Sequence, residues 1–196
     1  MAITEILLVR HGATDWSASG KHTSITDVAL NAKGTREARQ IGTLLARRSF
    51  DATFTSPLRR AHETAILAGY PNAQTDTDLS EWHYGAFEGK TSADIHKTDP
   101  DWGIFRCGGP DGETPQQVID RCDRILTGWT QRGYESILCF SHGHLLRALA
   151  TQWVEQPIAL GACLDLDPGS ISRLGWRRHE RVLQLWNYAP CRQFTA

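Results

Sequence analysis

The stretch TEILLVRHG, residues 4–12, joins an apolar run directly to a cation, an imidazole and a glycine. The run has no polar alternation and is rich in Ile, Leu and Val, so we predict a strand over Thr4–Val9 that is buried on both faces. Arg10, His11 and Gly12 then lie at its carboxyl end, where open α/β sheets bind their ligands. These three residues form a candidate anion site, because Arg attracts phosphate and Gly lets the backbone approach closely.

A second strand with the same ending lies further along the chain, and His142 is 131 positions after His11. We predict this strand over Ile137–Phe140, and the sequence SHGH, residues 141–144, follows it directly. A single histidine at a strand end is more often a hydrogen-bonded structural residue than a catalytic one. Two strands that both end in His-Gly favour a chemical role for the pair.

A third predicted strand, Ala52–Thr55, ends in the sequence SPLRR, residues 56–60. Ser56 is the expected N-cap of the following helix and Pro57 its first residue, and the helix should reach about Ala68. Parallel strands have their carboxyl ends at one edge of the sheet, so we expect this segment to meet the two His-Gly segments there.

Strands alternate with helices along the chain, which predicts the α/β class: a three-layer α/β/α sandwich with a mostly parallel central sheet. The length of 196 residues predicts a single domain over 1–196, with loop excursions at about 13–30 and 80–113 that cover the site. The other predicted elements are a helix capped by Asn31, a strand near 73–77, a short helix over 92–97, a helix opened by a capping box at 114–117, a helix ending near Val154 and a strand pair over 170–174 and 182–186.

Composition excludes several classes of protein. The 21 basic and 22 acidic residues give a net charge of −1, which argues against a nucleic-acid partner. No apolar run approaches the roughly 20 residues of a membrane span, so no membrane partner is expected. The five cysteines are odd in number and lack C-x-x-C spacing, which favours a reducing cytoplasm over a disulfide framework. They are Cys107, Cys122, Cys139, Cys163 and Cys191.

Five motifs in order carry a specific resemblance that runs from Leu7 to about Tyr188. They are LVRHGAT at 8–14, TSPLRRAHETA at 55–65, LSEWHYGAFEG at 79–89, GET at 112–114 and SHGH at 141–144. The chain resembles the histidine phosphatase superfamily, whose fold is shared by cofactor-dependent phosphoglycerate mutases and acid phosphatases.

The resemblance implies that His11 is the phosphorylated nucleophile and Glu81 the proton donor. The implied phosphate clamp consists of Arg10, Arg60 and His142. Cations around a phosphate stabilise the charge that develops during in-line attack, so the two arginines and a protonated His142 would make a metal unnecessary. The other residues expected to bind substrate are Ser17, Thr23, Ser24, Tyr84 and Gly143.

We interpret the other histidines and Glu88 as structural residues. Glu88 is expected to be structural, and His22, His62, His83 and His96 are expected in packing or at the surface. His144 forms a His-x-His pair with His142 that suggests a metal, but no carboxylate or cysteine completes a recognisable ligand set. We therefore expect neither a metal nor a cofactor.

The segment between the third and fourth motifs bears on the reaction. Mutases of the resembled family have a longer middle segment with a Lys and paired Arg that grip a second anionic group, whereas Lys90–Gly112 is short and has three cations. Hydrolysis of small phosphate esters such as sugar phosphates is favoured, as in the acid phosphatase and sedoheptulose-bisphosphatase branch. Phosphoglycerate mutase and a non-catalytic phospho-ligand binding module are the alternatives, although a pure binder would not need His11 and Glu81. The sequence leaves open whether the chain forms a homodimer.

Overall fold

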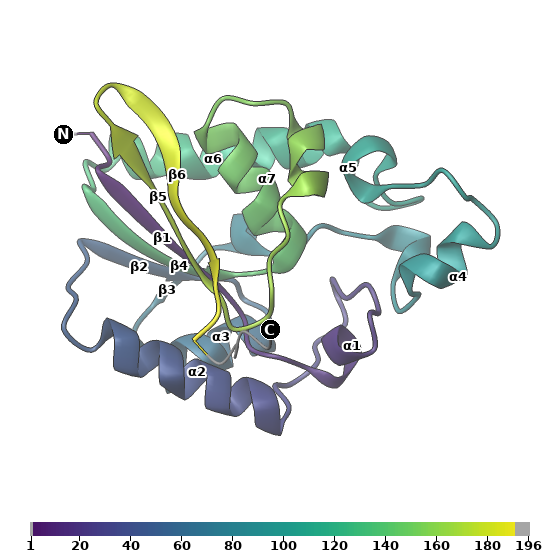
Figure 1. Ribbon diagram of the computed structural model, residues 1–196, viewed down its shortest axis with the longest axis horizontal. Coiled ribbons are helices and arrows are strands. Elements are labelled where there is room, and N and C mark those ends of the chain that lie inside the picture. Colours follow the sequence, from purple (N-terminus) through teal and green to yellow (C-terminus); the bar gives the residue numbers. More distant parts are fainter. Residues whose placement is uncertain (1, 191–196) are drawn as a thin grey trace, which may run out of the picture.

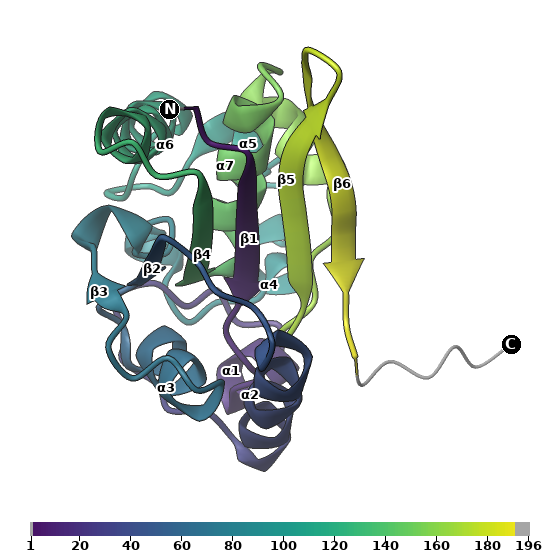
Figure 2. The ribbon, with the colours of Figure 1, turned by 90° about the vertical axis from the view of Figure 1, so that its left-hand side faces the viewer.

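The computed structural model describes residues 2–190, and their six strands form one sheet in the order β3-β2-β4-β1-β5-β6 (Figure 2). The strands are β1 Glu5–Arg10, β2 Ala52–Thr55, β3 Gln74–Thr75, β4 Ser136–Ser141, β5 Ile171–Arg177 and β6 Glu180–Tyr188. The first four are parallel, and β5 and β6 form an antiparallel hairpin beside β1. The sheet is therefore mixed, and the predicted mostly parallel arrangement applies to four of its strands.

Helices cover both faces of the sheet, as Figure 1 shows for α2 and α3 on one side and α6 and α7 on the other. The helices are α1 Asp15–Ala18, α2 Ala32–Leu45, α3 Arg59–Leu67, α4 Ser92–His96, α5 Ile104–Cys107, α6 Pro115–Gln131 and α7 Gly143–Trp153, with 3₁₀ turns η1 Thr77–Leu79, η2 Gly85–Phe87 and η3 Ile158–Cys163. This is the predicted α/β/α sandwich. Within residues 2–190, none of the helices has the length and apolar character to span a membrane.

The apolar run of β1 is explained by the two layers that it separates. Ile6 and Leu8 belong to the cluster that β1 forms with α6 and α7, whereas Leu7 and Val9 belong to the cluster with α2 and α3. Successive side chains of a strand point to opposite faces, so a strand covered on both sides must be apolar throughout. All four side chains are at most 3% exposed.

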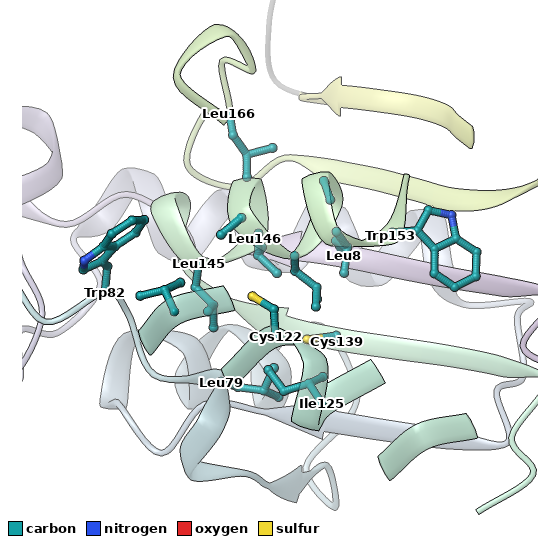
Figure 3. Close-up of a cluster of buried hydrophobic side chains, with 14 of the residues drawn as sticks. Leu8, Leu79, Trp82, Cys122, Ile125, Cys139, Leu145, Leu146, Trp153 and Leu166 are labelled. Carbon is teal, nitrogen blue, oxygen red and sulfur yellow. The ribbon is translucent and has the colours of Figure 1, made fainter. Parts of the chain in front are cut away.

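The layer between the sheet and α6 and α7 is the larger of the two cores. Figure 3 shows Leu145 and Leu146 of α7 and Cys122 of α6 beside Leu8 and Cys139 of the sheet. Both leucines are fully buried, and each such burial stabilises the fold by roughly 1.5–3 kcal/mol. Burial also raises the pKa of Cys122 to about 12, so this thiol acts as an inert packing group. Cys107 and Cys163 are exposed free thiols, and Cys191 lies outside the described residues.

The start of α3 differs from the prediction. The helix begins at Arg59 and its N-cap is Leu58, not Ser56, so Arg60 is the second helical residue. Asp27, from the loop before α2, accepts a hydrogen bond from the Arg59 N–H at 2.7 Å. A side chain distant in sequence thus supplies the cap that Leu58 cannot provide, and local sequence carries no signal for it.

Candidate active site

A cavity of about 150 Å³ opens at the carboxyl ends of β1 and β4. It is lined by Arg10, His11, Thr14, Ser17, Gly20, Lys21, His22, Thr23, Glu81, Tyr84, Gly143, His144 and Arg147. Seven of the ten predicted site residues are therefore part of the wall. Arg60, His142 and Ser24 are buried and are not part of the lining. The convergence expected from the three strand ends is present.

His11 is held with one defined ring nitrogen available for chemistry. Its Nδ1 lies 2.8 Å from the Gly12 carbonyl oxygen, and a carbonyl only accepts, so Nδ1 carries the proton. Nε2 is then the unprotonated nitrogen, which has the lone pair needed for attack on phosphorus. Burial, followed by the nearby Arg60 and Arg10 charges, lowers the pKa of His11 well below its usual value and keeps the ring neutral.

The backbone around His11 is fixed by close packing. The His11 N–H donates to Ser141 O at 2.9 Å, and its carbonyl accepts from Gly169 N at 3.0 Å. A Cβ atom at Gly12 would lie 2.5 Å from the Gly34 carbonyl oxygen, so only glycine allows the two backbones to meet. The glycine of the first motif therefore serves the packing of the loop that follows β1 against α2.

His142 lies beside His11, with 5.1 Å between the ring centroids. Its Nε2 is 2.8 Å from the Ser56 hydroxyl, while its Nδ1 is buried without a hydrogen-bond partner among the described residues. Burial and then the charge of Arg60 lower the pKa of His142 well below its usual value. Enclosure of the ring with cations therefore favours its neutral form, whereas the sequence analysis expected a protonated His142 beside phosphate.

Arg60 is held by a loop and not by a carboxylate. Its Nη2 donates to the carbonyl oxygens of Thr23 at 3.1 Å and Ser24 at 3.2 Å, and its Nη1 donates to Thr26 O at 3.2 Å. The side chain is only 1% exposed, and burial lowers its pKa. Carbonyl partners fix the position of the guanidinium while its full charge stays available to an anion.

The same loop is held from its other side by Glu88. The carboxylate accepts from the N–H groups of Ser24 and Thr26 at 2.9–3.0 Å and from the Ser24 hydroxyl at 2.5 Å. The Ser24 hydroxyl also accepts from Tyr84 N at 3.3 Å. The buried Ser24 hydroxyl therefore holds the loop together through Glu88 and Tyr84, and its expected contact with substrate stays a prediction. These contacts agree with the structural role that was expected for Glu88.

Arg10 is the second buried cation of the site. Its Nη1 donates to Leu166 O, its Nε has no hydrogen-bond partner in the described part of the chain, and burial lowers its pKa. Within residues 2–190 neither Arg10 nor Arg60 forms an ion pair, although Glu81 stabilises both charges at longer range. Two buried and incompletely compensated guanidinium groups beside a cavity favour a doubly charged anion there.

Glu81 is positioned by the N-terminus of α7. Its Oε1 accepts from the N–H groups of Trp82 and Leu145 at 2.9 Å, and its Oε2 accepts from His144 N at 3.1 Å. The side chain is 8% exposed and lines the cavity. Three backbone donors match the acceptors of an ionised carboxylate, so this carboxylate is rigidly held opposite the histidine pair.

Comparison with known proteins agrees with this geometry. The profile of the histidine phosphatase superfamily (branch 1) matches residues 6–189. The chain belongs to this superfamily. An acid phosphatase from Mycobacterium tuberculosis is 38% identical over 181 residues, which covers 91% of this chain and 89% of that protein. A sedoheptulose 1,7-bisphosphatase from Saccharomyces cerevisiae is 33% identical over 180 residues, covering 75% of this chain and 66% of that protein.

Solved structures give the same result for the fold. The product of an open reading frame from Mycobacterium tuberculosis superposes with a TM-score of 0.90 at 36% identity, covering 95% of this chain and 98% of that chain. The α-ribazole phosphatase from Shigella flexneri has a TM-score of 0.80 at 25% identity, with 94% and 96% covered. Together with the acid phosphatase relative, these matches identify the chain as a histidine phosphatase enzyme.

The outer wall of this histidine phosphatase contains residues that the sequence motifs did not single out. His22, expected in packing or at the surface, lines the cavity, and burial lowers its pKa to about 4. The Tyr84 hydroxyl lies 2.5 Å from His144 Nδ1. Arg147 lies three residues after His144, which is one helical turn, so the helical period was the available signal for it.

Two histidines of the histidine phosphatase site, His142 and His144, have a spacing that metal sites also use. Among residues 2–190 no group of three or more His, Cys, Asp or Glu side chains is arranged to hold a metal ion. The His-x-His pair is divided, because His142 turns its Nε2 to Ser56 and His144 turns its Nδ1 to Tyr84.

Proposed function

We propose that this enzyme is a metal-independent, cofactor-independent phosphomonoester hydrolase of the acid phosphatase type, acting through a phosphohistidine on His11. Its substrates would be small phosphorylated metabolites such as sugar phosphates. The observation that carries the proposal is the hydrogen bond from His11 Nδ1 to Gly12 O, which leaves Nε2 as a lone pair beside two buried cations. The names of the acid phosphatase and sedoheptulose-bisphosphatase relatives support this substrate class.

In the first step, His11 Nε2 forms a bond to phosphorus while the ester P–O bond breaks. Arg10 and Arg60 donate to the non-bridging oxygens, where charge accumulates. The electron pair of the broken bond goes to the ester oxygen, which takes a proton from Glu81. Glu81 acts as the general acid of this step, so the step requires its carboxylic acid form.

In the second step, water attacks the phosphohistidine, and the N–P bond breaks with its electrons returning to His11. The Glu81 carboxylate takes the proton that water loses, so both groups are restored and inorganic phosphate leaves. The rigid position of Glu81 at the N-terminus of α7 suits it to serve both steps.

His142 contributes to phosphate binding as a neutral ring. When the Ser56 hydroxyl donates a hydrogen bond to Nε2, the single N–H of the neutral ring is on Nδ1. Nδ1 is then free to donate to a phosphoryl oxygen. The Ser56 oxygen in turn accepts from Leu58 N at 3.2 Å, which orients it. The arrangement needs no charge on His142, although a bound phosphate dianion favours the charged form.

The middle segment, Lys90–Gly112, supports hydrolysis over mutase activity. Lys90 lies over the Phe87 ring, Lys97 pairs with Asp94 at 2.7 Å, and the Arg106 guanidinium donates to Asp101 O at 2.6 Å. None of these three cations lines the catalytic cavity. Cations occupied outside the cavity do not hold a second phosphate on an intermediate, so water has access to the phosphohistidine. The free thiols of the described cysteines favour a cytoplasmic location.

Rapid quench with ³²P-labelled substrate tests the proposal. We expect a stoichiometric protein adduct that is acid-labile and base-stable, that disappears in His11→Ala, and that decays to inorganic phosphate in the presence of EDTA. An adduct on another residue would remove His11 from its role. Transfer of the label to phosphoglycerate instead of water would support the mutase, and binding without any adduct or phosphate release would support a binding module.

A further inference from the structure

A buried ion pair outside the catalytic cavity holds the segment that carries Glu81. Arg121 of α6 and Glu113, which lies in the loop before α6, are joined at 2.7 Å between Arg121 Nη2 and Glu113 Oε2. The Arg121 side chain is 7% exposed, and neither residue is part of the cavity lining. The proposed mechanism assigns no role to this pair.

Arg121 holds the chain immediately before Glu81. Its Nη1 donates to the carbonyl oxygen of Asp78 at 2.9 Å and to that of Ser80. The guanidinium is a rigid planar fork, so one side chain fixes two backbone carbonyls and the Glu113 carboxylate relative to each other. The backbone that leads into Glu81 is therefore anchored to α6.

Glu113 holds the chain immediately after Glu81. Its Oε2 accepts from His83 N at 2.8 Å, and its backbone N–H donates to His83 O at 2.9 Å. Its carbonyl oxygen accepts from the indole N–H of Trp82, which is fully buried, at 2.9 Å. A shift of the backbone on this side of Glu81 would break several of these contacts at once.

We propose that the Arg121–Glu113 ion pair positions Glu81 for proton transfer, with Arg121 as the positioning residue. This inference rests on the proposed role of Glu81 as proton donor. The N-terminus of α7 binds the Glu81 carboxylate at 2.9–3.1 Å, whereas the ion pair fixes the backbone from which this side chain extends. Proton transfer needs hydrogen-bond distance to the leaving oxygen, and a displacement of about 1 Å can cost about 100-fold in rate.

The dependence on the leaving group tests this assignment. We would measure the single-turnover rate of enzyme phosphorylation with glycerol 3-phosphate, whose leaving alkoxide needs a proton, and with p-nitrophenyl phosphate, whose leaving group does not. In Arg121→Met the rate with glycerol 3-phosphate should fall about 10- to 100-fold, and the rate with p-nitrophenyl phosphate should fall much less. Arg121→Lys should give a smaller loss of the same selectivity, because it keeps the charge without the planar fork.

Two further variants control for folding and for charge. Arg124→Met is the matched control, because Arg124 lies on the same helix and forms an exposed ion pair with Asp78 at 2.8 Å. It removes a cation beside the same segment but no contact with the backbone around Glu81, so both rates should stay unchanged. Glu113→Gln keeps the size of the partner side chain and should reproduce the selective loss more weakly. It tests the inference even where Arg121→Met folds poorly.

A double-mutant cycle distinguishes positioning of Glu81 from a general structural role. In the Glu81→Gln background the carboxylic proton is absent, so adding Arg121→Met should change the rate with glycerol 3-phosphate by no more than about 2-fold. A further loss as large as that in the wild-type background would overturn the inference. Equal losses of Arg121→Met with both substrates, or unchanged rates, would overturn it as well.

The same measurements separate this inference from the function on which it rests. If Glu81→Gln by itself slows both substrates equally, the proton-donor role of Glu81 fails, and the inference about Arg121 fails with it. If Glu81→Gln is selective for glycerol 3-phosphate but Arg121→Met and Glu113→Gln are not, only the inference about Arg121 fails.

Discussion

The carboxyl ends of β1 and β4 have nearly the same sequence but different chemistry. Each strand ends in a His-Gly pair, the strands are parallel neighbours, and Arg10 pairs with Ser141 in register. His11 hydrogen-bonds a carbonyl oxygen, which can only accept, whereas His142 hydrogen-bonds the Ser56 hydroxyl, which can donate or accept. The carbonyl fixes one tautomer of His11 with a free Nε2 lone pair. The hydroxyl permits the tautomer of His142 in which Nδ1, which has no hydrogen-bond partner among the described residues, is the donor. We therefore infer that hydrogen-bond partners, more than the motif, distinguish the proposed nucleophile from the proposed phosphate ligand.

Removing each histidine gives the largest expected contrast. His11→Ala should reduce kcat by at least about 10⁴-fold, because no other group forms the intermediate. His142→Ala removes a donor to the phosphoryl group, and should cost about 10²–10³-fold while the adduct on His11 still forms. Single-turnover quench measures both quantities. Equal losses without any adduct in His142→Ala would contradict the division of roles.

A substitution of Glu81 gives the next largest effect. The N-terminus of α7, the helix that follows His142, holds the Glu81 carboxylate at the cavity that His11 also lines. Glu81→Gln keeps the size of the side chain but lacks the carboxylic proton, and should slow phosphoryl transfer from alkyl phosphates by about 10²–10⁴-fold. With p-nitrophenyl phosphate the leaving group needs no proton, so the loss in that step should be smaller. An equal loss with both substrates would mean that Glu81 positions the site, and no loss would place the proton donor elsewhere.

A substitution of Glu88 tests whether the loop that holds Arg60 contributes to phosphate binding beside the two histidines. In Glu88→Gln the amide NH₂ faces backbone N–H donors, so residues 23–26 should loosen and Arg60 should lose its carbonyl partners. We expect KM to rise about 10-fold with a smaller change in kcat, and stability to fall by about 1–3 kcal/mol. Glu180→Gln, at an exposed site on β6, is the control. A Tm loss without a change in KM would separate the loop from phosphate binding.

The smallest effect concerns pH, and here the two histidines should behave alike. Burial lowers the pKa of His11, His142 and His22, so below pH 6.5 the unfolded chain binds protons that the folded chain does not. Stability contributed by these rings is present above pH 6.5 and is lost as pH falls toward about 4, the pKa of His22. Thermal melts across this range should show Tm falling, and the slope should be shallower in His22→Gln. An unchanged slope would contradict the assignment to His22.

Particular residues show which parts of the fold and of the site could be predicted from the sequence. The apolar run of β1, the Asn31 cap and the capping box at Thr114 are local signals, and each element forms where they predict. The start of α3 was misplaced because Asp27, from a separate loop, caps it. The bonds of the Ser24 hydroxyl to Glu88 and Tyr84 were not predicted, because both partners lie in a segment about 60 positions away.

By itself, the sequence determined the buried strands, the order of the motifs and the residue types at the strand ends, because hydrophobic periodicity and capping act between near neighbours. Only the tertiary structure decided the tautomer of His11, the burial that lowers the pKa of His142 and the place of Arg147 in the cavity wall. Protonation and charge depend on burial and on partners brought from other elements. Those quantities exist only after the layers have packed, so no pattern along the chain contains them.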